Sequence, residues 1–312
     1  MNIGSFRLVA IVLVLVAAAG LWFGPIIGNG AANGDANRAG HAHADEAGIR
    51  IVSLAPHLTE LAFEAGIGDL LVGAVEWSDY PAAAADIPRI GDAFRFDLER
   101  IVRLEATHAL AWAGGTPPGA ISELRHLGVE VKLVEIQTLE QIAGAIERLG
   151  HLGGNEAAAN ASAADFRRRL ERFRQRAGGG QTNVEVFYQV SEKPLFTLGR
   201  EHVINEVLAL CNAANIFGDL ETAAGSVDLE AVLARDPLAV VASDAENNNP
   251  VAHWQAYPDL RAVACDNMLR VDPALLVRPT PRVLDGAKKL CQWLDREVRP
   301  DESNNCIPDQ AG

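Results

Sequence analysis

Two acidic residues occupy matched positions in a repeated pattern. The stretches 97–106 and 228–237 both read Asp-Leu-Glu, one further residue and then a run of mostly aliphatic residues that ends near an acid. An aspartate at a helix N-cap accepts a backbone hydrogen bond, and a glutamate in the first turn interacts favourably with the helix dipole. The same arrangement exposes Glu99 and Glu230, which could then bind two basic residues of a symmetric partner. Spacing alone leaves both interpretations open.

The other reactive side chains match no catalytic or metal-binding motif. The sequence contains no G-x-S-x-G, Walker A, G-x-G-x-x-G or H-E-x-x-H pattern. A bare-metal site needs three or four convergent ligands. We therefore expect a binding protein rather than an enzyme, with no metal site and no cofactor of its own. The histidines are spread over different predicted elements: His57, His108, His126, His151, His202 and His253.

The N-terminus has the layout of an export signal. Arg7 precedes an apolar run that starts at Leu8, and small residues follow it. The apolar stretch is also long enough to span a bilayer, so residues 1–28 are expected to be either a cleaved signal peptide or a membrane anchor. Residues 29–48 are rich in Gly, Ala, Asn and Asp and predict a flexible linker. Its two histidines, His41 and His43, are expected to be solvated.

Composition excludes some partners and favours others. The formal net charge is −14 over 312 residues, and such a surface repels nucleic acid and anionic lipid. The only expected membrane contact is the N-terminal anchor, if it is retained. Four cysteines in an exported protein predict at least one disulfide. The expected location is therefore outside the cytoplasm.

The elements predict two similar α/β lobes joined by one helix. In residues 49–154 short apolar strands alternate with helical segments, which is typical of a parallel sheet covered by helices. Residues 155–177 contain no Pro or Gly and predict a single long connecting helix. Residues 178–300 repeat the strand and helix pattern as a second lobe, and residues 301–312 form a tail. The repeated Asp-Leu-Glu segments then occupy equivalent places in the two lobes.

The chain resembles a known family, the periplasmic cobalamin-binding proteins that serve ABC importers. The resemblance extends over roughly residues 50–294 and depends on the order of its motifs. These are Arg50–Pro56, Thr59–Phe63, Trp77–Pro81, Asp97–Val102, Ala111–Gly115, Pro194–Gly199, Leu208–Phe217, Pro281–Arg282 and Lys289–Cys291. The motifs are specific for the class of binding proteins with a helical backbone. They are less specific for the ligand, because siderophore and haem binders share the same frame.

The resemblance implies a fold and a way of working. It implies two Rossmann-like lobes joined by a single long helix, with the ligand held in the cleft between them. It also implies that Glu99 and Glu230 engage arginines on the two permease copies of the importer, and that the binding protein is a monomer. Cys211 and Cys291 are the pair for which the resemblance implies a disulfide. Cys265 and Cys306 have no such support and either pair or stay free.

The expected ligand site combines this resemblance with the chemistry of a flat macrocycle edged with amides. Cobalamin enters as the transported ligand, and aromatic faces suit it because they give contact area at little cost in rotamer entropy. Tyr80 and Trp112 match aromatic positions that line the cleft in the family. The complete expected set, drawn from both lobes, is Tyr80, Trp112, Trp77, Phe94, Tyr188, Arg278 and Arg282.

Two local features bear on the identity of the ligand. Where known family members carry a tryptophan before the second acidic turn, this chain has Thr222–Ser226, which loosens one wall of the pocket. His57 stands at a strand-to-helix turn, where an imidazole could ligate the metal of a chelate or simply be solvated. The alternatives are a ferric siderophore, haem and, with less support, a bare metal. Siderophores usually need more basic cleft residues than Arg95 and the two arginines of the expected set.

Overall fold

The structure is a computed structural model that describes residues 48–177, 184–244 and 249–298. The predicted N-terminal segment 1–28, the linker up to residue 47 and the tail 301–312 lie outside these ranges. So does Cys306. Within the described ranges, no helix combines the length and the apolar composition that a membrane crossing requires.

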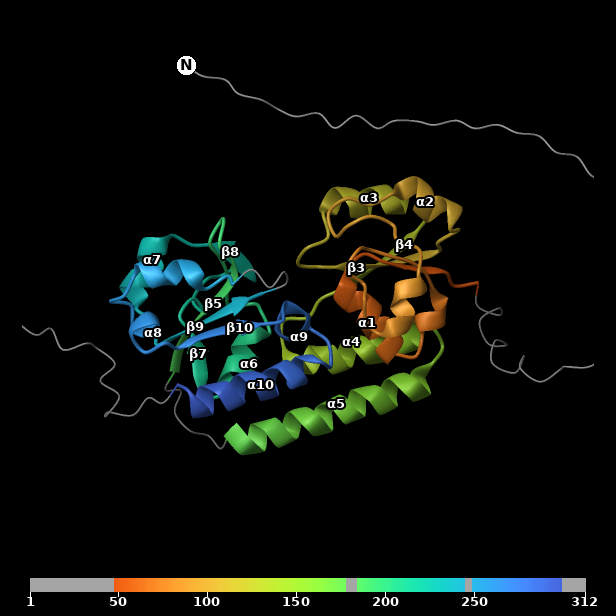
Figure 1. The fold of residues 1–312 in the computed structure, drawn as a ribbon. Helices are drawn as coiled ribbons and strands as arrows, with labels where there is room; N and C mark the ends of the chain where they lie inside the picture. Colours follow the sequence, from red (N-terminus) through yellow and green to blue (C-terminus); the bar gives the residue numbers. More distant parts are fainter. Residues whose placement is uncertain (1–47, 178–183, 245–248, 299–312) are drawn as a thin grey trace, which may run out of the picture. The chain divides into compact units, whose positions relative to one another are not determined.

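The N-terminal lobe is built on a parallel sheet, as predicted (Figure 1). Its strand order is β2-β1-β3-β4, and every pairing is parallel. Parallel strands require crossover connections, and the alternating helices provide them. Its elements are β1 (Ile51–Ser53), α1 (Pro56–Glu64), η1 (Gly68–Leu70), β2 (Leu71–Ala74), η2 (Ala82–Asp86), α2 (Leu98–Arg103), β3 (His108–Trp112), α3 (Pro118–His126), β4 (Glu130–Val134) and α4 (Leu139–Leu152).

The C-terminal lobe has a mixed sheet, in which β10, β9, β5 and β7 pair in parallel. Its order is β10-β9-β5-β6-β8, with β7 also pairing with β5. Strand β6 runs antiparallel to both β5 and β8, and the few residues between β5 and β6 allow only a hairpin there. Its elements are β5 (Val184–Ser191), β6 (Phe196–Leu198), α6 (Ile204–Leu210), β7 (Ala213–Asn215), β8 (Ala224–Ser226), α7 (Leu229–Arg235), β9 (Ala239–Ser243), η3 (Ala252–Ala256), α8 (Arg261–Ala264), β10 (Met268–Val271), α9 (Pro273–Leu276) and α10 (Val283–Arg296).

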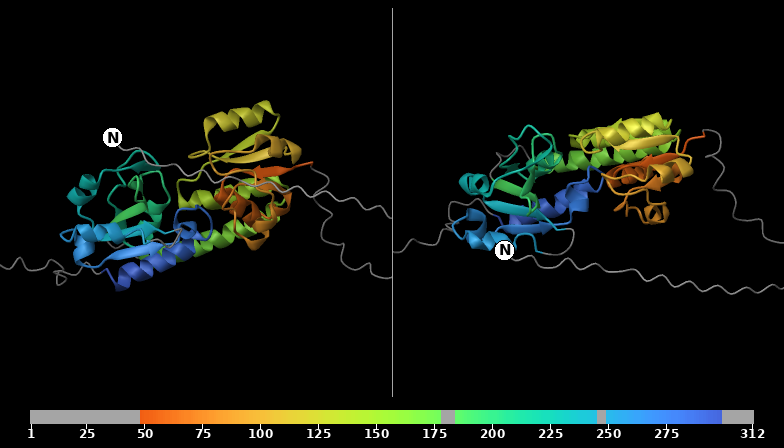
Figure 2. Two further views of the ribbon diagram at one scale, coloured as in Figure 1. Left: turned by 45° about the horizontal axis from the view of Figure 1, so that its top comes forward. Right: turned by 90° about the horizontal axis from the view of Figure 1, so that it is seen from above.

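One long helix, α5 (Glu156–Ala177), connects the lobes, as predicted. It packs closely against α4, where a Cβ on Gly150 would lie only 2.1 Å from the Cβ of Ala159. Towards its other end Arg169 forms an ion pair with Asp285 of α10 at 2.8 Å. Figure 2 shows α5 running alongside elements of both lobes. Its buried face, which includes Phe166 and Leu170, belongs to a core cluster with members in both lobes.

The two repeated Asp-Leu-Glu segments begin short helices, but only one aspartate caps its helix. The carboxylate of Asp97 accepts a hydrogen bond from the backbone N–H of Arg100 at 2.9 Å, which confirms the predicted cap of α2. Asp228 stands at the N-cap position of α7, yet its side chain makes no capping bond. The side-chain cap is therefore absent at Asp228, although its extended backbone is the usual conformation of an N-cap residue.

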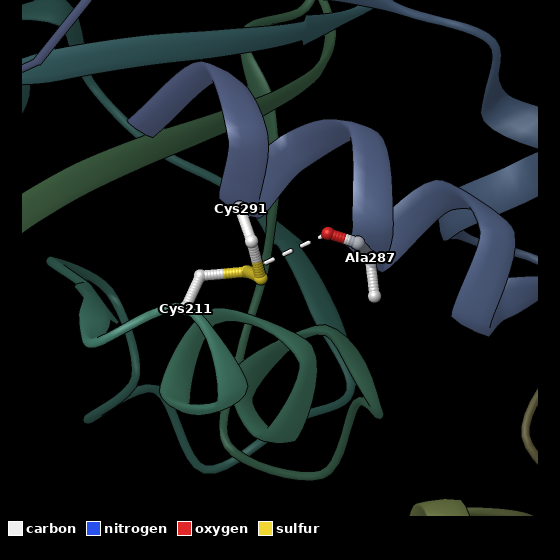
Figure 3. Close-up of a disulfide and its surroundings, with 3 residues drawn as sticks. All are labelled: Cys211, Ala287 and Cys291. Carbon is white, nitrogen blue, oxygen red and sulfur yellow. Dashed lines mark hydrogen bonds between the residues drawn. A yellow bond between two sulfur atoms is a disulfide. The ribbon is translucent and has the colours of Figure 1, made fainter. Parts of the chain in front are cut away.

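The disulfide implied by the resemblance is present. Cys211 follows α6, and Cys291 lies within α10, so the bond joins the C-terminal end of α6 to the helix that packs against it (Figure 3). Cys211 Sγ lies 3.7 Å from the carbonyl oxygen of Ala287, which is a packing contact because an oxidised sulfur has no proton to donate. Cys265 is also disulfide-bonded.

Candidate ligand site

The carboxyl ends of β2 and β3 carry three of the seven predicted ligand residues, and β1 ends beside them. Strands β2 and β3 both pair with β1 in parallel, so the three strands end at the same edge of the sheet. The chain leaves β1 towards His57, leaves β2 towards Trp77 and Tyr80, and ends β3 at Trp112. Ligands of open parallel sheets bind at such edges.

Two arginines of the C-terminal lobe reach this edge and meet at one acid of the N-terminal lobe. Glu60 of α1 is only 2% exposed. Its carboxylate accepts hydrogen bonds from Arg282 Nε at 3.0 Å and Nη2 at 2.8 Å. Arg278 Nη1 donates to the same carboxylate at 3.2 Å. A buried carboxylate needs such partners, because an unpaired buried charge is strongly unfavourable.

Both arginines make further contacts with the segment after β2. Arg278 donates to Asp79 at 2.9 Å and to the backbone oxygen of Trp77 at 3.1 Å. Partial burial of Asp79 acts to raise its pKa, but the hydrogen bond and charge of Arg278 outweigh burial and hold that pKa below the usual range. The guanidinium of Arg282 lies over the ring of Tyr80, 3.9 Å from its centroid. Partial burial acts to lower the pKa of Arg282, but Glu60 raises it.

Trp112 is held at the end of β3 by the glycines after it. A Cβ on Gly115 would lie 2.0 Å from the indole ring, so only glycine lets the chain fold back against the tryptophan. The ring is partly buried, and its edge contact with His57 has a centroid distance of 5.5 Å. The orientation of Trp112 is therefore fixed at the edge of the sheet that Arg278 and Arg282 reach.

His57 lies between Trp112 and the C-terminal lobe. Its side chain is buried, and its Nε2 has no hydrogen-bond partner. Burial, followed by the charges of Arg278 and His202, lowers the pKa of His57 to about 3, so the imidazole is neutral at physiological pH. His202 of the other lobe is also kept neutral, because burial lowers its pKa to about 4. Its Nδ1, however, accepts a hydrogen bond from the backbone of Ile204 at 3.1 Å.

The remaining predicted aromatic residues differ widely in their exposure. Trp77 and Phe94 are each 72% exposed. Phe94 borders a shallow hollow with Leu98 and Pro117. Tyr188 is fully buried in the core of the C-terminal lobe, with its hydroxyl 3.3 Å from Ser243. The prediction that Tyr188 faces a ligand is wrong for this conformation, because β5 continues beyond it to Ser191.

Glu60 is part of the site but is absent from the predicted set, because nothing in the motif Thr59–Phe63 signals an ion pair. Its partners lie 218 and 222 residues away along the chain. Only the fold brings them together, so no local pattern could have found this contact.

The segment Thr222–Ser226, which lacks the tryptophan of known family members, takes part in the mixed sheet. Ala224–Ser226 form β8, which pairs with β6 at the edge of the C-terminal sheet. These small side chains are only partly buried or exposed. The structure therefore supplies no aromatic side chain at this position.

Glu99 and Glu230 are both exposed near the starts of their short helices, α2 and α7. Each is the second residue of its helix. Within the described ranges, neither carboxylate has an ion pair or side-chain hydrogen bond with the rest of the protein. Both are thus free to meet a partner from solution.

Comparisons with known proteins agree on one family. A family model described as periplasmic binding protein matches residues 51–263. The vitamin B12-binding protein of Vibrio cholerae serotype O1 is 38% identical over 247 residues, which cover 78% of this chain and 88% of that protein. The crystal structure of the periplasmic vitamin B12-binding protein BtuF of Vibrio cholerae aligns with a TM-score of 0.71, over 79% of this chain and 96% of that one. A periplasmic haem-binding protein from Pseudomonas aeruginosa is 26% identical, with a TM-score of 0.68 over 78% of this chain and 91% of that one.

Proposed function

Because this chain belongs to the periplasmic binding protein family, we propose that it captures cobalamin or a related corrinoid in the cell envelope and delivers it to an ABC importer. The observation that carries this proposal is the 38% identity to a vitamin B12-binding protein across 88% of that protein. The proposed role is binding and release, without a chemical change in the ligand.

The proposed ligand contacts come from both lobes. Tyr80, Trp112 and Trp77 would pack against the flat face and edges of the macrocycle, and Phe94 would extend this surface. Arg278 and Arg282 would donate hydrogen bonds to its amide oxygens. Tyr188 is not in the proposed set because it is buried. Aromatic and guanidinium groups suit such a ligand, since they combine large contact area with directed donors.

The proposed delivery step uses the two exposed acids. Glu99 and Glu230 would each bind a basic residue on one of the two permease copies, and a single molecule of the binding protein would be enough. Their matched places in two similar lobes support this proposal, since a symmetric partner offers two equivalent contacts. We further propose that the protein acts in the periplasm, either released or tethered there through its N-terminal segment.

The test of the ligand is calorimetry on the soluble part of the chain with cyanocobalamin, a ferric siderophore and haemin. We expect cyanocobalamin to bind with a Kd below about 1 μM and the other two to bind much more weakly. Trp112→Ala should weaken cyanocobalamin binding by at least about tenfold. Leu133→Ala, at an exposed position on β4, is the control and should change nothing. Failure of every corrinoid to bind would rule out this assignment.

Haem is the second candidate, because one specific observation favours it. The unpartnered imidazole of His57 is a suitable axial ligand for haem iron, and one haem-binding protein shares the fold at 26% identity. Tight binding of haemin with no corrinoid binding would establish this alternative. A bare-metal site has less support, because the described residues hold no group of three or more His, Cys, Asp or Glu suited to a metal ion.

A further inference from the structure

A ring nitrogen of His57 is buried without a partner at the edge where the lobes meet. The side chain is 6% exposed, and Nε2 has no hydrogen bond. Buried polar atoms in folded proteins nearly always have a partner, so an exception requires an explanation. Within the described ranges, only two other buried side-chain atoms share this condition, and one of them is Thr280 Oγ1, between Arg278 and Arg282. Two of the three unpaired atoms therefore belong to the segments of the proposed ligand site.

The surroundings of His57 point to a ligand rather than to a structural role. A structural histidine binds its neighbours, as His202 does by accepting the backbone N–H of Ile204. His57 instead has the indole of Trp112 at its side and Arg278 and His202 as the charged or titratable groups that act on it from the other lobe. It is the second residue of α1, four residues after the last residue of β1 and three residues before Glu60. The neutral ring therefore holds an unused lone pair beside the residues that would contact the macrocycle.

We infer that His57 binds the cobalt of the captured corrinoid through Nε2, and thereby selects corrinoids whose upper axial position is exchangeable. This inference rests on the proposed function. The step is a ligand exchange: the Nε2 lone pair forms the cobalt–nitrogen bond, the cobalt-bound water leaves, and cobalt stays in the +3 state. Neutral imidazole is a common ligand for transition metals. Cyanide holds the same position more firmly, so cyanocobalamin would bind without this bond.

The test compares aquocobalamin with cyanocobalamin on the same protein. We expect aquocobalamin to bind at least about tenfold more tightly and its visible absorption bands to shift on binding. Cyanocobalamin should bind with an unchanged spectrum. His57→Ala should remove both the preference and the shift, so that the variant binds aquocobalamin and cyanocobalamin with similar affinities and leaves both spectra unchanged.

Two further variants control the experiment. His57→Gln keeps a polar side chain of similar size and should lose the spectral shift, which covers the case in which His57→Ala folds poorly. His151→Ala removes an exposed imidazole at the end of α4 and should keep both the preference and the shift. Equal affinities and unchanged spectra for the two corrinoids would overturn this inference and leave the proposed function standing. If neither corrinoid bound, the proposed function itself would be wrong.

Discussion

Glu60 has the strongest structural role among the residues of the candidate site. Its carboxylate is buried and serves both arginines of the opposite lobe. Removing one partner of a buried ion pair leaves the other charges without compensation. The side chain of Glu60 therefore stabilises the contact between the lobes.

Glu60→Gln should lower the free energy of unfolding by about 2–4 kcal/mol, because a neutral amide cannot balance two guanidinium groups. Urea denaturation at neutral pH measures this loss. Asp165→Asn is the matched control, since it removes an acid from the exposed ion pair with Arg168 on α5. It should change the free energy by less than about 1 kcal/mol. Equal effects of the two variants would show that Glu60 is no more important than a surface acid.

The sequence predicts the structural position of a residue well where its nearest neighbours in the chain determine that position. Trp112 before two glycines is held at a strand end as expected, and Asp97 caps its helix. Tyr188 fails because β5 has neighbours on both sides and is buried along most of its length. A strand's position in the sheet depends on distant parts of the chain, so the burial of Tyr188 could not be predicted from the residues around it.

At the scale of elements, the disulfide fixes α6 against α10. It closes a loop of 80 residues, for which the chain-entropy model gives a stabilisation of about 4–5 kcal/mol. The double variant Cys211→Ala and Cys291→Ala should lose about 2–5 kcal/mol of unfolding free energy in urea denaturation. Substitution is preferable to a reducing agent, which would also act on the bond of Cys265. An unchanged denaturation midpoint would contradict this stabilising role.

The elements themselves follow largely from periodicity and from helix-stop signals. Helices α1 and α3 end two residues before Gly66 and Gly128, whose positive φ of 71° and 84° favours glycine at a helix C-terminus. The long connecting helix begins within one residue of its predicted start. The antiparallel strands β6 and β8 were not predicted, because each has only three residues and too few for a period to appear.

At the scale of the whole molecule, the repeat predicts two comparable exposed acids, and the proposed docking depends on both. Reversal of both charges, Glu99→Lys with Glu230→Lys, should weaken binding to the importer by at least about tenfold and leave corrinoid affinity unchanged. The control reverses two exposed acids elsewhere, Glu171 and Glu201, so that the net charge changes equally. Surface plasmon resonance on the reconstituted importer measures both. If the two double variants behaved alike, docking would depend on net charge and not on these positions.

The lobe pattern could be predicted from the sequence, whereas the contacts between lobes could not. The alternation of strands and helices is local information, repeated in each half. The meeting of Arg278 with Glu60 and Asp79 depends on how α5 sets the lobes against each other, which no window of sequence contains.

The bridge from Glu60 to the two arginines also bears on how fast the protein can take up its cargo. The two arginines proposed to bind the ligand also join the lobes through Glu60, so a ligand that takes these donors competes with the carboxylate. The measured affinity would then be the intrinsic affinity reduced by the fraction of molecules in which the donors are released. Such a carrier would load its ligand more slowly and would bind other solutes less often.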